Sequence, residues 1–161
     1  IGYSVEEKLE LKLTWLQDRR DMDDKSLSKL VQTSPSVLGL SVKANLEPKL
    51  AWLQERLDMD DNSLSKLVKT MPQVLGYNVE KNLKPKLIWL QDRLDMDEKS
   101  LSKLVQSHPS ILGLSVKANL EPKLTWLQER LVMDDNSLSN LVKMNPPVPG
   151  FSVETNLKPK I

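Results

Sequence analysis

The sequence predicts an all-α solenoid of 37-residue repeats, and three observations lead to that prediction. Tryptophan recurs every 37 residues, at Trp15, Trp52, Trp89 and Trp126. Proline and glycine keep the same spacing, at Pro35, Pro72, Pro109 and Pro146, and at Gly2, Gly39, Gly76, Gly113 and Gly150. No insertion or deletion interrupts the series, and a fixed period of this length is typical of stacked repeats that contact only their neighbours. We therefore expect one array, with repeat 1 at 2–38, repeat 2 at 39–75, repeat 3 at 76–112, repeat 4 at 113–149 and a partial repeat 5 at 150–161.

Each repeat is expected to begin with a long helix, as repeat 2 illustrates. Ser41 is a suitable N-cap, because its hydroxyl can accept a hydrogen bond from an amide of the first turn. Apolar residues then follow at spacings of three and four, which place them on one helical face: Val42, Leu46, Leu50, Leu53 and Leu57. Pro48 allows two interpretations: a bent, continuous helix, or a helix that begins near Asn45 with the proline in its first turn. We favour the bent helix, and repeat 1, which has Leu11 at this position, should be straighter.

A shorter helix and a tight turn should complete the repeat. Asp60 and Asp61 can cap the second helix and interact favourably with its dipole. Its apolar stripe is Leu64, Leu67, Val68 and Met71. Pro72 should end it, and 72–76 is short enough for a 3₁₀ turn in which Gly76 supplies a permissive backbone. No stretch alternates apolar and polar residues with strand character, so the predicted class is all-α.

Composition excludes several classes of function. The 161 residues carry 23 basic and 22 acidic side chains, so a net charge of +1 gives no global signal for nucleic acid. The absence of cysteine excludes disulfides and thiolate chemistry and fits a reducing or organellar compartment. No run approaches the roughly 18 apolar residues of a membrane span, so we expect no membrane partner. The sequence stops at Ile161, within a repeated helix, which suggests a piece of a longer array.

Neither a catalytic nor a metal site is expected. The segment 58–62 has the opening spacing of a calcium-binding loop, but Ser63 and Lys69 stand where that loop needs glycine and glutamate. His108 is the only histidine, and the sequence has no nucleophile elbow and no phosphate-binding loop. We therefore expect a protein that is not an enzyme and has no cofactor.

The repeat also resembles a known family. Residues 72–90 read PQVLGYNVEKNLKPKLIWL, and 109–127 repeat the pattern of Pro, Leu-Gly, Asn-Leu, Pro-Lys-Leu and Trp-Leu. This pattern resembles the repeat of the mitochondrial transcription termination factor (mTERF) family, and the resemblance covers essentially the whole chain. It implies units of two α-helices and a 3₁₀ turn, stacked into a curved superhelix. It also implies action in a mitochondrion or chloroplast, with double-stranded DNA or RNA bound along a basic concave face.

Basic residues on the first helix are the first candidates for nucleic-acid binding. Asn45, Lys49, Trp52 and Arg56 form a stripe beside the leucine face. The stripe recurs in every repeat, with Lys8 in place of asparagine in repeat 1. The candidate phosphate contacts are Lys12, Lys49, Lys86 and Lys123, and Arg19, Arg56, Arg93 and Arg130. Tryptophan in this stripe could stack on bases, or it could pack between repeats while the cations lie over it.

The second helix offers a further candidate surface. Lys29, Lys66 and Lys103 occupy one position in successive repeats, on the face opposite the apolar stripe. Beyond the capping aspartates this face carries no acid, so it is either a weakly basic binding strip or a solvated surface.

The function expected from this sequence is binding of double-stranded DNA or RNA, through the phosphate backbone, by an organellar regulator of transcription or RNA metabolism. The alternative is a protein-binding or architectural scaffold without nucleic-acid affinity. The array ends carry exceptions: Arg20 occupies a slot that holds leucine elsewhere, and Asn145 and Pro149 replace apolar residues. We expect these ends to expose apolar surface and to permit end-to-end self-association.

Overall fold

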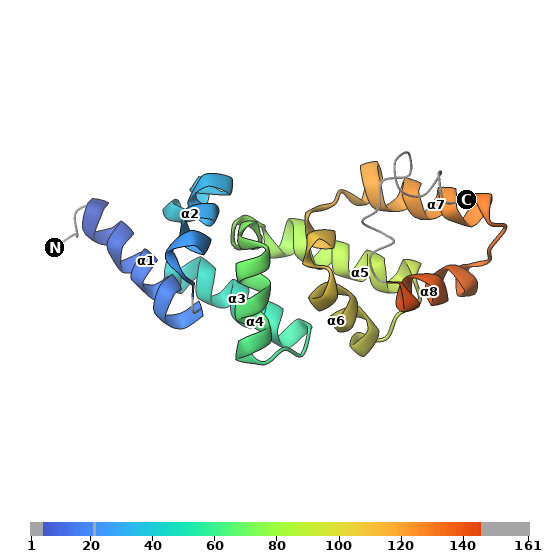
Figure 1. The fold of residues 1–161 in the computed structure, drawn as a ribbon, viewed down its shortest axis with the longest axis horizontal. Coiled ribbons are helices and arrows are strands. Elements are labelled where there is room, and N and C mark those ends of the chain that lie inside the picture. Colours follow the sequence, from blue (N-terminus) through green and yellow to red (C-terminus); the bar gives the residue numbers. More distant parts are fainter. Residues whose placement is uncertain (1–4, 21, 146–161) are drawn as a thin grey trace. The chain divides into compact units, whose positions relative to one another are not determined.

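The computed structural model describes residues 5–20 and 22–145, and they form α-helices joined by short helical turns (Figure 1). The chain divides into two compact units, Ile1–Asn78 and Val79–Ile161. The first unit contains α1 (Val5–Arg20), α2 (Asp24–Thr33), α3 (Glu47–Arg56) and α4 (Asp61–Thr70). The second contains α5 (Lys84–Arg93), α6 (Glu98–Ser107), α7 (Glu121–Arg130) and α8 (Asp135–Met144). The described residues include no strand, which confirms the all-α class.

Proline shapes the start of each first helix after repeat 1. A π-helical turn leads directly into the helix each time: η2 (Val42–Leu46), η4 (Val79–Leu83) and η6 (Val116–Leu120). In η2 the amide of Leu46 donates to the Ser41 carbonyl over 3.0 Å, five residues back, and Leu46 keeps right-handed helical dihedrals. The path through Pro48 is therefore continuous but widened, as a proline without an N–H donor allows. In α1, where Leu11 replaces proline, the described helix is uninterrupted α.

Side-chain caps begin the helices as the sequence predicts. The Ser41 hydroxyl accepts from the Ala44 amide over 3.1 Å, and the Asp60 carboxylate accepts from the Ser63 amide over 2.7 Å. Each second helix has an aspartate cap of this kind, at Asp23, Asp60, Asp97 and Asp134. The hydrogen bond from the serine amide lowers the pKa of each capping aspartate, so these groups stay ionised to a lower pH than an ordinary aspartate does.

The predicted 3₁₀ turns are present as η1 (Pro35–Gly39), η3 (Pro72–Gly76) and η5 (Pro109–Gly113). The expected role of Gly76 is wrong, because no described glycine has a positive φ. Left-handed dihedrals occur instead just after α3, α5 and α7, at Asp58, Asp95 and Val132.

The apolar stripes form the core of each unit. In the first unit α1 contacts α2 and α4, α2 contacts η3, and α3 contacts α4. Leucines of both helices are fully buried there, at Leu16, Leu46, Leu50, Leu53 and Leu64, and their counterparts Leu83, Leu87, Leu90 and Leu101 are buried in the second unit. The expectations about Pro149 and partial repeat 5 lie outside the described residues, as does the side chain of Arg20.

Candidate nucleic-acid interface

The candidate lysines of the first helices are buried or half-buried. Lys49, Lys86 and Lys123 are only 5%, 7% and 6% exposed, and Lys12 is half-buried. The amine of Lys49 donates to the Leu75 carbonyl over 2.5 Å, and that of Lys86 donates to the Leu112 carbonyl over the same distance. Lys12 makes the equivalent bond to the Leu38 carbonyl. In each case the lysine ties the first helix to the 3₁₀ turn 26 residues further along the chain.

This burial has an electrostatic consequence. Loss of hydration disfavours the charged amine and lowers the pKa of all four lysines. An amine that is buried, or held against a carbonyl inside its own unit, is poorly placed to neutralise a phosphate. We therefore leave Lys12, Lys49, Lys86 and Lys123 out of the interface proposed below.

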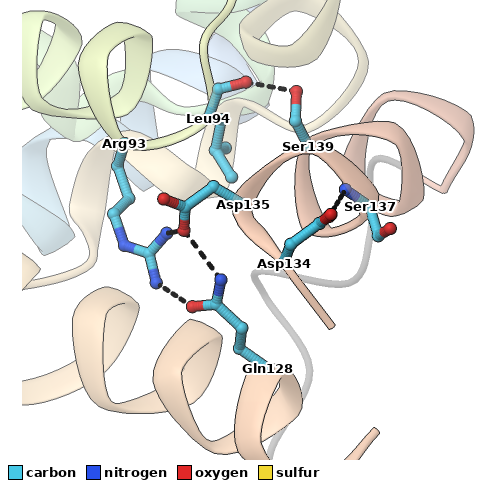
Figure 2. A network of polar contacts seen from close by, with 7 residues as sticks. All are labelled: Arg93, Leu94, Gln128, Asp134, Asp135, Ser137 and Ser139. Carbon is cyan, nitrogen blue, oxygen red and sulfur yellow. Dashed lines mark hydrogen bonds and ion pairs between the residues drawn. The ribbon is translucent and has the colours of Figure 1, made fainter. Parts of the chain in front are cut away.

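Arg93 joins two repeats within the second unit. Its guanidinium donates to Gln128 Oε1 over 2.8 Å and to Asp135 Oδ1 over 3.2 Å, as Figure 2 shows. The Arg93 side chain is 19% exposed, because α7 and α8 supply its partners. Its two hydrogen bonds therefore link repeat 3 to repeat 4.

The other arginines of this row differ in exposure. Arg56 is half-buried and Arg130 is exposed. The side chain of Arg19 lies outside the described part of the structure. The row is therefore not uniformly available to a ligand.

Two further contacts surround Arg93, and sequence reasoning missed both. The buried Ser139 hydroxyl donates to the Leu94 carbonyl, so a serine of α8 closes the end of α5 (Figure 2). The Gln128 amide donates to the Asp135 carboxylate over 2.7 Å. This bond fixes the position of the two side chains that accept from Arg93. The sequence does contain a signal for this pair, because every repeat has a glutamine followed seven residues later by an acid. In the structure these residues are hydrogen-bonded in all four repeats, at Gln17–Asp24, Gln54–Asp61, Gln91–Glu98 and Gln128–Asp135.

The tryptophans are neither fully buried between repeats nor fully exposed for base stacking. All four indoles are half-buried. The Trp15 N–H donates to Glu47 Oε1 over 3.3 Å, from α1 to the start of α3. Trp15 thus packs against its own unit and also contributes a polar contact there.

The candidate lysines of the second helices are exposed. Lys29, Lys66 and Lys103 are all exposed, at the same register of α2, α4 and α6. Lys25 and Lys99 are exposed one turn earlier on α2 and α6. Acidic residues on these helices occur only in the first turn, so the remaining length presents positive charge or neutral polar groups.

Other kinds of site have no support among the described residues. No group of three or more His, Cys, Asp or Glu within 5–20 and 22–145 is arranged to hold a metal ion. No helix in these ranges is long and apolar enough to cross a membrane.

Paired helices, a recurring 3₁₀ turn and a proline-bearing first helix define a helical-repeat protein. The mTERF family model matches residues 1–161, and the chain belongs to the mTERF family. At the level of the family this is a helical-repeat, nucleic-acid-associated regulator, and members are generally binding proteins that are typically organellar. No curated protein sequence gives a significant match.

Proposed function

We propose that this chain binds double-stranded DNA or RNA through the phosphate backbone, with the exposed lysines of the second helices as its principal contacts. The observation that carries this proposal is the exposure of Lys29, Lys66 and Lys103 at one register of three successive second helices. By family, we assign the activity to transcription or RNA metabolism in a mitochondrion or chloroplast.

The chemistry of lysine suits this kind of contact. An ammonium group is a compact charge that pairs with a phosphate and releases its counterion, whichever base is attached. Base recognition needs planar donors or acceptors directed at base edges, and the three lysines supply none. We therefore expect binding that depends strongly on salt and weakly on sequence. Arg56 and Arg130 are secondary candidates for phosphate contacts. Arg93 is not included, because its guanidinium is bonded to Gln128 and Asp135.

The test is fluorescence anisotropy with labelled duplex DNA and labelled RNA, over a range of salt concentrations. Replacing Lys29, Lys66 and Lys103 with Gln should weaken binding at least about tenfold at low salt. It should also reduce the slope of log K against log salt by about 3, since each lost phosphate contact removes about 0.9.

The matched control changes the same number of charges elsewhere. Lys43, Lys81 and Lys117 are also exposed, but they lie on the π-helical turns rather than on the second helices. Replacing these three with Gln should change affinity much less. An equal loss in the two triple variants would contradict the assignment of binding to the second-helix lysines.

A protein-binding scaffold is the second candidate function, and the net charge of +1 favours it. Absence of nucleic-acid binding by the wild-type chain even at low salt would reject the first proposal and leave the scaffold.

A further inference from the structure

Two exposed positions of the second helices change their chemistry between repeats 3 and 4. In α6 these positions hold Lys99 and Lys103, and in α8 they hold Asn136 and Asn140. Residues four apart lie on the same face of a helix, about 6 Å apart along its axis. The exposed face that carries two ammonium groups in repeat 3 therefore carries two carboxamides in repeat 4.

This face stays exposed when another repeat follows. Repeat 4 is bonded to repeat 3 through the buried Ser139 hydroxyl, yet Lys99 and Lys103 remain exposed on α6. A further repeat placed in the same way after repeat 4 would leave Asn136 and Asn140 exposed as well. Both carboxamides are thus on a surface that a ligand can reach.

A carboxamide offers a contact that an ammonium group cannot make. The asparagine side chain holds a donor and an acceptor in one plane, which matches the N7 acceptor and the N6 donor of adenine in the major groove of B-DNA. Asparagine is also shorter than lysine, so its helix has to approach the duplex closely, and that groove admits an α-helix. The major groove of duplex RNA is deep and narrow, and side chains cannot read it.

We propose that α8 reads adenine bases in the major groove of duplex DNA through the carboxamides of Asn136 and Asn140. This inference rests on the proposed function, because the exposed lysines supply the backbone contacts that hold the duplex. Successive bases of one strand are about 3.4 Å apart. Two groups about 6 Å apart on a helix therefore reach bases one or two steps apart. The result is a preference for two nearby adenines, added to binding that otherwise depends on the phosphates.

The test is binding of the full chain to duplex DNA with a randomised central segment, followed by sequencing of the bound fraction. The wild-type chain should enrich two nearby adenines, and the enriched duplex should bind about tenfold more tightly than the starting mixture, as a bidentate base contact allows. Replacing these adenines with 7-deazaadenine, which pairs normally but lacks N7, should remove the gain. The double variant Asn136→Ala, Asn140→Ala should enrich no adenine and should bind both duplexes alike.

The matched control replaces Lys99 and Lys103 with Ala, at the same two positions of α6. This variant should bind every duplex more weakly. It should also lower the slope of log K against log salt by about 2, because each lost phosphate contact removes about 0.9. It should keep the preference for adenine, whereas the asparagine variant should keep the wild-type salt slope. Circular dichroism should show the wild-type helix content in both variants.

The outcomes separate this inference from the proposed function. Wild-type binding without enrichment of adenine would overturn the role of the two asparagines and leave the proposed function standing. A preference that survives the asparagine variant or the loss of N7, or that appears equally on duplex RNA, would overturn that role too. Absence of binding to any duplex at low salt would reject the proposed function and the base contacts with it.

Discussion

At the residue scale, burial decides what each lysine does. Lys49 and Lys66 belong to one repeat, yet the first is 5% exposed and bonded to a carbonyl, and the second is exposed on α4. The sequence does not reveal this difference, because the partner of Lys49 is the backbone of Leu75, 26 residues away, and any residue type offers a carbonyl. The partners of Arg93 are equally hidden in the sequence, because they lie on helices of the next repeat.

Replacing Lys49 with Met tests this division of roles. Methionine keeps the apolar stem but removes the donor, so the Leu75 carbonyl loses its partner inside the unit. The free energy of unfolding should fall by about 1–3 kcal/mol, the usual cost of a buried polar group left unpaired. Urea unfolding followed by circular dichroism measures it.

Lys66→Met is the matched control for this substitution. An exposed lysine of α4 should change stability by less than about 0.5 kcal/mol when replaced. A Lys49→Met variant as stable as Lys66→Met would refute the structural role of the buried amine.

At the element scale, the first helices end in a way that favours short polar residues. Asp58 and Asp95 follow α3 and α5 with φ of 48° and 46°, and Val132 follows α7 with φ of 50°. Aspartate tolerates this left-handed region, whereas a β-branched side chain is strained there. Val132 is 92% exposed, so packing does not compensate for that strain.

The strain at Val132 predicts a stabilising substitution. Val132→Asn should raise the free energy of unfolding by about 1 kcal/mol, because asparagine adopts left-handed dihedrals readily and adds no charge. Thermal or urea unfolding measures the change. The reverse substitution, Asp95→Val, should lower stability at the equivalent helix end, and equal stability of Val132→Asn and the wild-type chain would argue against strain.

Local chemistry explains which elements could be predicted. Ser41, Asp60 and Pro72 act on residues within five positions of themselves, so their sequence alone identified the caps and the 3₁₀ turn. The π-helical turn before Pro48 was not predicted, because apolar spacing does not distinguish hydrogen bonds that reach four residues back from those that reach five. The hydrogen bond from Ser139 to the Leu94 carbonyl was missed for another reason, since its acceptor is a backbone carbonyl of the preceding repeat, which every residue type offers.

At the scale of the whole molecule, the repeats are covered unequally. In a repeat array, stability is approximately a sum of repeat terms and nearest-neighbour terms, so a repeat with fewer contacts opens first. Leu57 of repeat 2 is 1% exposed, whereas Leu131 of repeat 4 is 40% exposed. Repeat 4 also carries the strained Val132, which makes it the weaker of the two.

This inequality predicts that the chain does not unfold in one step. Two variants, in which Trp52 or Trp126 is the single tryptophan and the others are replaced with Phe, place one half-buried reporter in repeat 2 or repeat 4. The fluorescence of Trp126 should change at a lower urea concentration than that of Trp52, because repeat 4 opens before repeat 2. Far-UV circular dichroism of the two variants should superimpose, which controls for the substitutions themselves. Coincident fluorescence curves would show that the repeats unfold as one cooperative body, and nearest-neighbour coupling would then outweigh the differences between repeats.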